Sequence, residues 1–169
     1  MIIPTATDVA RTLGSKFEEL IMPVLEKPQE KSAAQTIRHL LRFLEHRIED
    51  EGQILLDEVF KLSDILDKVA SHFEAQDTGT SESESLAAAI RKTLAEEQDP
   101  KVYPSLALMG KKVSAMRQHV CNALAEVQKG VEDQANEDIH NILREYISWQ
   151  IEQEGKMVKP AFWGHGPRR

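Results

Sequence analysis

The most regular apolar pattern of the chain extends from Ile37 to Phe73. Apolar residues recur there at alternating spacings of four and three, which is typical of a helix that buries one narrow stripe against other helices. Gly52 occupies the only stripe position that lacks an apolar side chain. The apolar stripe consists of Ile37, Leu41, Leu44, Ile48, Leu55, Val59, Leu62, Leu66, Val69 and Phe73.

The length of this pattern constrains its structure. A straight helix of roughly 40 residues would be about 60 Å long, which is roughly twice the width of a compact domain of this size. Glycine tolerates the left-handed conformation that ends many helices, and the acids before Gly52 suit the start of another helix. We therefore expect a kink or break near Gly52 and favour two tightly joined helices, over 32–50 and 53–75. The alternative is one long helix with an exposed half.

Similar periodicity predicts four more helices, over residues 9–22, 86–97, 104–129 and 136–154 or 158. The first follows possible N-cap residues from Thr5 to Asp8 and ends near Met22, because Pro23 cannot donate a backbone hydrogen bond. Ser32 opens a capping-box pattern for the next helix. No segment alternates like a strand, so we predict an all-α fold: a helical bundle of about six helices, mostly up-and-down.

The polar stretches between these helices suggest one domain with two irregular parts. Residues 76–85 contain no apolar side chain and are rich in Gly, Ser, Thr and acids, which predicts a flexible loop. Glycines and prolines over 155–169 predict an irregular tail. Each half of the chain would be small for an independent core, so we expect residues 1–169 to form a single helical-bundle domain.

Composition and charge narrow the function classes. The 169 residues include 28 acids and 21 lysines and arginines, a net charge of −7, which argues against nucleic-acid or anionic-membrane binding. Cys121 is the only cysteine, so a reducing compartment is the simplest interpretation. No signal-peptide pattern or long apolar segment is present. We expect a cytoplasmic protein.

No phosphate-binding glycine loop, nucleophile-elbow motif or cysteine pair occurs, which removes the enzyme classes that are easiest to recognise. One cluster could still bind a small anion: Arg38 and Arg42 share one helix face, and His39 and His46 share another. The alternative is a solvated ladder of ion pairs between these arginines and Glu45 or Glu49, and we favour it because such ladders are common on helix surfaces.

A second cluster is the pair Glu137 and His140. This Glu-x-x-His spacing puts two metal ligands one helical turn apart, as in ferritin-like di-iron bundles, which use the pair on two helices. The pair occurs only once here, and a glutamate in a first helical turn is favoured in any case. We therefore commit to no metal and no cofactor, and keep this pair as an alternative.

Several features together resemble a known group of proteins. They are Pro4-Thr5-Ala6 before a helix with a late proline, a helix that begins at Ala33-Ala34, and a closing helix that contains Leu143-Arg144-Glu145-Tyr146. The chain is similar in this to small all-helical proteins encoded beside acyl-CoA dehydrogenases and phosphotransferase-like kinases. The resemblance implies an accessory role near such enzymes and transfers no catalytic residue.

Our functional prediction is a helical accessory or interaction protein without catalysis of its own, in a homodimer or with another protein partner. It rests on a stripe longer than one compact domain needs, and on aromatic residues that could meet a partner: Phe43, Trp149, Phe162 and Trp163. The alternatives are a bundle that binds a small anion or acyl-CoA-type ligand and, less favoured, a ferritin-like metal protein.

Overall fold

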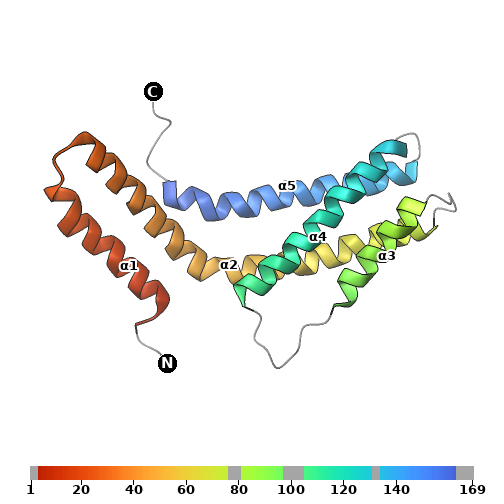
Figure 1. Ribbon diagram of the computed structural model, residues 1–169, viewed down its shortest axis with the longest axis horizontal. Helices are drawn as coiled ribbons and strands as arrows, with labels where there is room; N and C mark the ends of the chain where they lie inside the picture. The colour runs from red at the N-terminus through yellow and green to blue at the C-terminus, as the bar shows by residue number, and fades with distance from the viewer. Residues whose placement is uncertain (1–3, 76–80, 97–104, 131–133, 163–169) are drawn as a thin grey trace. The chain divides into compact units, whose positions relative to one another are not determined.

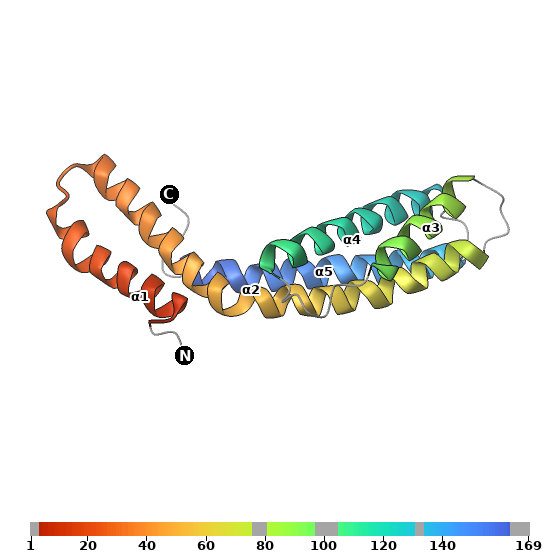
Figure 2. The same ribbon diagram turned by 60° about the horizontal axis from the view of Figure 1, so that its bottom comes forward.

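The computed structural model describes residues 4–75, 81–96, 105–130 and 134–162 and is all-helical over these ranges (Figures 1 and 2). The predicted all-α class is therefore confirmed, with five α-helices in place of six. Among the described residues, no helix has the length and apolar content that crossing a bilayer requires. The α-helices are α1 (Ala6–Lys16), α2 (Pro28–Ala75), α3 (Ser81–Ala95), α4 (Leu106–Val127) and α5 (Gln134–Phe162).

The difference in helix count arises at Gly52. Helix α2 continues through this residue for 48 residues in all, so the predicted break into two helices is wrong. A single glycine inside a helix costs only about 1 kcal/mol relative to alanine, which the long flanking segments can offset. Helix α2 also begins at Pro28, before the predicted start at Ser32, because the first turn of a helix does not use the missing proline N–H.

Two segments predicted to be irregular are partly helical. Helix α3 begins at Ser81 and therefore includes the second half of the predicted loop over 76–85. Helix α5 passes through Gly155 and reaches Phe162, so the predicted tail is helical over 155–162. Residues 76–80 and 163–169 lie outside the described residues, and the predictions there are not addressed.

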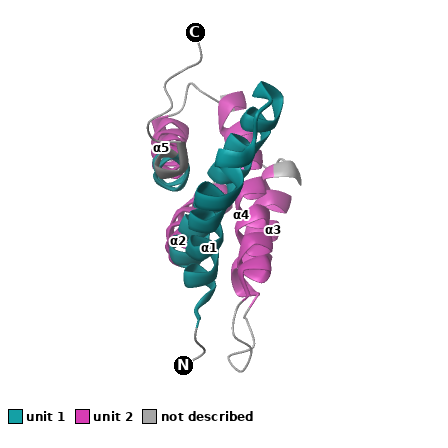
Figure 3. Cartoon of the chain, turned by 90° about the vertical axis from the view of Figure 1, so that its left-hand side faces the viewer, with its two compact units in different colours: residues 1–52, 152–169 teal, residues 53–151 magenta. Residues whose placement is uncertain are grey.

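The chain divides into two compact units at Gly52 and Ile151 (Figure 3). Unit 1 comprises residues 1–52 and 152–169, and unit 2 comprises residues 53–151. The single domain over 1–169 stays a prediction.

Unit 2 is a four-helix arrangement with a continuous core. It contains the second half of α2, α3, α4 and the first half of α5, and successive helices run in opposite directions (Figures 1 and 2). The predicted stripe of α4 is buried from Met109 to Val127, as expected from its periodicity. The core side chains with no exposed surface include Leu62, Leu66, Val69, Ile90, Met116, Ala123 and Leu143.

One arginine of α3, Arg91, makes several polar contacts with α2. Arg91 donates hydrogen bonds to the Glu74 carboxylate and to the Ser71 hydroxyl at 2.9 Å, and it also pairs with Asp67. All three acceptors lie on the last turns of α2, so this fork sets the register of α3 next to the apolar contacts of Ala87 and Ile90.

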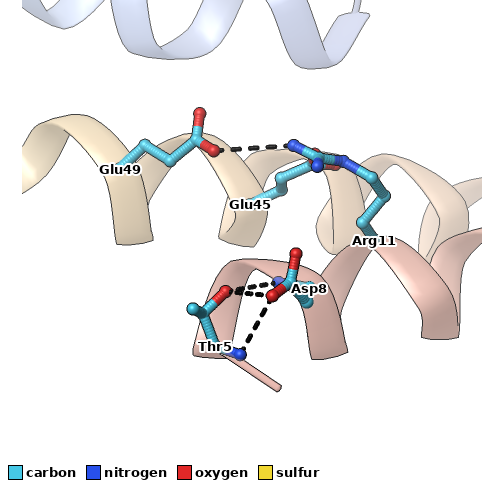
Figure 4. A network of polar contacts seen from close by, with 5 residues as sticks. All are labelled: Thr5, Asp8, Arg11, Glu45 and Glu49. Atoms are coloured by element: carbon cyan, nitrogen blue, oxygen red, sulfur yellow. Dashed lines mark hydrogen bonds and ion pairs between the residues drawn. The ribbon is translucent and has the colours of Figure 1, made fainter. Parts of the chain in front are cut away.

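Unit 1 contains a hairpin of α1 and the first half of α2, which run antiparallel (Figures 1 and 2). The Thr5 hydroxyl caps α1 by accepting from the Asp8 amide at 3.1 Å, and the Asp8 carboxylate accepts from the Thr5 amide at 3.0 Å (Figure 4). Past α1, a π-helical turn (Phe17–Ile21) and a 3₁₀ turn (Met22–Val24) continue the helical segment through Pro23 to Val24, close to the predicted end near Met22.

The hairpin has almost no buried core. Within the described part of unit 1, only Ala10 and Ala34 are buried, at 4% and 3% exposure. Ion pairs add the remaining links: Arg11 lies 2.8 Å from Glu45 and 3.5 Å from Glu49 (Figure 4). Unit 2 therefore carries the fully buried apolar core, whereas the hairpin combines two buried alanines and half-buried apolar side chains, such as Phe17 and Leu41, with its ion pairs.

This contrast within α2 gives a stability prediction for unit 2. We expect Leu66→Ala to lower the free energy of unfolding by about 3 kcal/mol, because it opens a cavity at a fully buried position. Leu56→Ala is the matched control on the same helix, where the side chain is 39% exposed, and we expect a loss below about 1 kcal/mol. Equal losses in urea denaturation would contradict the assignment of the core.

Candidate functional site

The long stripe of α2 is covered over only part of its length. In unit 2 its members Leu62, Leu66, Val69 and Phe73 are at most 2% exposed. In unit 1 the same stripe remains open to solvent, because Ile37, Leu44 and Ile48 are 45%, 48% and 37% exposed. The helical phase is the same in both halves, so the difference lies in what packs against the stripe.

Helix α1 packs beside the stripe instead of on it. Across the hairpin, Glu45 pairs with Arg11 and Arg38 pairs with Glu18, and the buried Ala34 and half-buried Leu41 share their helix face at spacings of four and three. We take this row as the centre of the contact with α1. At 100° per residue, the exposed positions Ile37, Leu40, Leu44 and Ile48 lie about 50–130° around the helix from this contact, all in one rotational sense. Leu40 itself is 58% exposed.

Helix α1 presents a matching stripe. Val9 and Leu13 lie about 90° from the buried Ala10 in the same rotational sense, and they are 44% and 55% exposed. Leu20 and Ile21 extend the stripe into the π-helical turn, at 57% and 44% exposure. Because α1 and α2 are antiparallel, equal rotation in one sense turns both stripes toward the same side of the hairpin.

We call this surface the hairpin apolar face. Its roughly 700 Å² of exposed apolar side chain exceeds the few hundred square ångströms that the largest patch on a monomeric protein usually covers, and such patches mark interaction sites. The face consists of Val9, Leu13, Leu20, Ile21, Ile37, Leu40, Leu44 and Ile48, all between 37% and 58% exposed.

The opposite side of the hairpin is polar. Arg11 and Glu49 are rotated in the other sense from the helix contact, and they meet on that side together with Glu45 (Figure 4). Glu18 pairs there with Arg38 and Arg42. The hairpin therefore has the ion pairs of Arg11 and Glu18 on one side and its exposed apolar side chains on the other, where Lys16–Glu19 and Arg47–Glu51 are charged pairs beside the apolar residues.

Two of the four residues of the predicted anion-binding cluster, Arg38 and Arg42, lie together and contact an acidic side chain of the same chain. Arg38 and Arg42 do converge, but on the Glu18 carboxylate: Arg38 donates to Glu18 through Nε, and Arg42 Nη2 lies 3.5 Å from the same oxygen. His39 and His46 are half-buried on the neighbouring flank of α2. The ion-pair interpretation holds for the arginines, although their acid comes from the π-helical turn and the predicted partners Glu45 and Glu49 bind Arg11.

Glu137 and His140 lie together at an open pocket of about 400 Å³. Asn136, at its edge, is bonded to His72 of α2 at 2.8 Å. Within the described ranges, no set of three His, Cys, Asp or Glu side chains is grouped to hold a metal ion. The pocket is lined by Val127, Asn136, Glu137, His140, Asn141 and Arg144, and it contains none of the predicted anion-binding residues.

Sequence reasoning missed a buried polar network in unit 2. The Glu58 carboxylate is 2% exposed and accepts from Arg117 Nε at 2.7 Å, from Arg117 Nη2 at 2.9 Å and from the Tyr146 hydroxyl at 2.5 Å. These contacts join α2, α4 and α5. The available signal was the position of Glu58, three residues after Leu55 and four before Leu62, on the helix face of the apolar stripe.

This network is structural in character. Glu58, Arg117 and Tyr146 do not line the described pocket, and the carboxylate has its charge matched and its oxygens bonded. Burial raises the pKa of the Tyr146 phenol above its ordinary value, and the hydrogen bond to Glu58 and its negative charge add to the shift. A neutral, donating phenol is thereby kept in place beside the acid.

Phe43 and Trp149, two of the aromatic residues predicted to contact a partner, each have a cationic side chain over the ring. Arg47 lies over the Phe43 ring at 5.6 Å, and Lys61 lies over the Trp149 ring at 5.4 Å. Trp149 also packs against the core next to Tyr146, with 6.2 Å between the ring centroids. The Phe162 side chain and Trp163 lie outside the part of the chain that the structure describes.

No protein-family model, curated protein or solved structure matches this chain at a significant level. Two structural features bear on function: the hairpin apolar face and the closed core of unit 2 with its buried network of Glu58, Arg117 and Tyr146.

The raised pKa of the Tyr146 phenol predicts how the stability of unit 2 depends on pH. Because the folded-state pKa of Tyr146 is raised, its stabilising contribution is fully present below the ordinary value of about 10 and is lost as pH rises through the folded-state value. In a Tyr103→Phe background, the 295 nm absorbance reports this phenol directly. We expect its ionisation to coincide with alkaline loss of helical circular dichroism. Ionisation near pH 10 with full helix content would contradict the buried network.

Proposed function

We propose that the protein is a non-catalytic helical interaction protein that contacts a protein partner through the hairpin apolar face. The observation that carries this proposal is the stripe of α2, which is buried from Leu62 onward and open at Ile37, Leu44 and Ile48. An apolar surface of this extent is a common feature of protein interaction sites.

The form of the surface also indicates the kind of partner. The spacings of four and three on α2 suit knobs-into-holes packing by another helix, since each side chain of such a stripe can insert between four side chains of a facing helix. The ion pairs of Arg11 and Arg38 lie on the other side of the hairpin, and the charged residues beside the apolar face are paired with each other, Lys16 with Glu19 and Arg47 with Glu51. A helical, apolar and uncharged partner surface fits the hairpin apolar face best.

Two predictions from the sequence belong to this proposal. One is the accessory role beside acyl-CoA dehydrogenases or phosphotransferase-like kinases, which the resemblance implies. The other is a cytoplasmic location. Both stay predictions, and neither assigns a catalytic residue.

Photo-crosslinking tests whether the face is a contact surface. We would replace Leu40 by a photoreactive benzophenone amino acid and irradiate cells that express the variant. Phe60 of unit 2, 67% exposed and also on α2, is the matched control for an exposed apolar position. We expect discrete covalent protein adducts from position 40 and none from position 60. Equal labelling, or no adduct at position 40, would overturn the proposal.

A further inference from the structure

We infer that the occupant of the hairpin apolar face is a second copy of this chain, so that two hairpins close into an intermolecular four-helix bundle. This inference rests on the proposed function and goes further, because it names the partner and the mode of contact. Three observations support a second copy over another protein.

The first observation is the shape of the surface. Each copy offers two antiparallel helices with apolar stripes on the same side, which is half of a four-helix bundle. A two-fold axis across the face would bring each stripe against stripes of the other copy, and the same residues would serve on both sides. No new surface has to be supplied, because the hairpin complements itself.

The second observation is charge. The whole chain carries −7, and two copies would repel each other if they met over an acidic surface. Residues 4–52 instead contain seven lysines and arginines and nine acids, so this segment is close to neutral. Arg11, Arg38 and Arg42 pair with acids away from the apolar face, and the two cations beside the face, Lys16 and Arg47, are each paired with a neighbouring acid, Glu19 and Glu51. Like charges therefore do not oppose contact at this side.

The third observation is area. Roughly 700 Å² of exposed apolar side chain per copy is close to the 800 Å² that each partner contributes to a standard stable interface. The buried core of the hairpin itself is limited to Ala10 and Ala34 among the described residues. If the eight apolar side chains of the face packed against those of a second copy, the hairpin would gain a larger buried core than Ala10 and Ala34 provide.

Analytical ultracentrifugation measures the association directly. In reducing buffer, because Cys121 is exposed, we expect wild-type protein at about 50 µM to sediment at twice the 19.1 kDa of one chain. Leu44→Glu puts two carboxylates into the contact and should weaken the dimer at least about 100-fold. Phe60→Glu, the control outside the face, should remain dimeric. A monomeric wild type, or a Leu44→Glu variant whose dimer dissociation constant over a dilution series equals that of the wild type, would overturn the inference.

A second measurement covers the case in which Leu44→Glu unfolds the hairpin. The position-40 crosslinking variant, mixed from ¹⁴N- and ¹⁵N-labelled copies, should give adducts of twice the chain mass that join one light and one heavy peptide. We expect those peptides to contain residues 6–24 or 34–48 of the other copy. Adducts only with a different protein would refute self-association while the proposed function stands. Absence of any adduct would refute both.

Discussion

The apolar stripe of α2 is buried in unit 2 and exposed in the hairpin. The remaining features of the structure depend on this difference in burial. In the hairpin, Ala10 and Ala34 are the buried side chains, and one buried methyl group contributes only about 0.8 kcal/mol. Ordering a residue costs about 1–2 kcal/mol in backbone entropy, and half-exposed ion pairs such as Arg11 with Glu45 return at most about 1 kcal/mol each. A hairpin with so small a core gains most from an apolar surface that covers it.

In unit 2 the apolar stripe is covered by helices of the same unit. Helices α3, α4 and α5 cover its part of the stripe, and a buried acid next to that stripe, Glu58, accepts hydrogen bonds from Arg117 and Tyr146. A buried carboxylate with a missing partner is strongly destabilising, so the network ties three helices to one register. Unit 2 is therefore the part of the described chain with a closed core, and the proposed contact surface lies on the hairpin.

Local patterns predicted much of this fold, and long-range contacts account for what they missed. The stripe of α4, the Thr5 cap and the end near Pro23 follow from neighbours a few residues apart. The break at Gly52 failed because a glycine weakens a helix without ending it. The partners of Glu58 are 59 and 88 residues away, and the Glu18 carboxylate that pairs with Arg38 comes from a different helical segment, so neither pairing is visible in the sequence.

The central claim is that the hairpin apolar face is covered by a second copy. Hydrogen–deuterium exchange at several protein concentrations tests it most directly, because covered helices open less often. We predict that amides of α1 and of residues 34–48 exchange more slowly as concentration rises, while those of α4 keep a constant rate. Exchange in the hairpin that is independent of concentration, from well below to well above micromolar protein, would contradict the account.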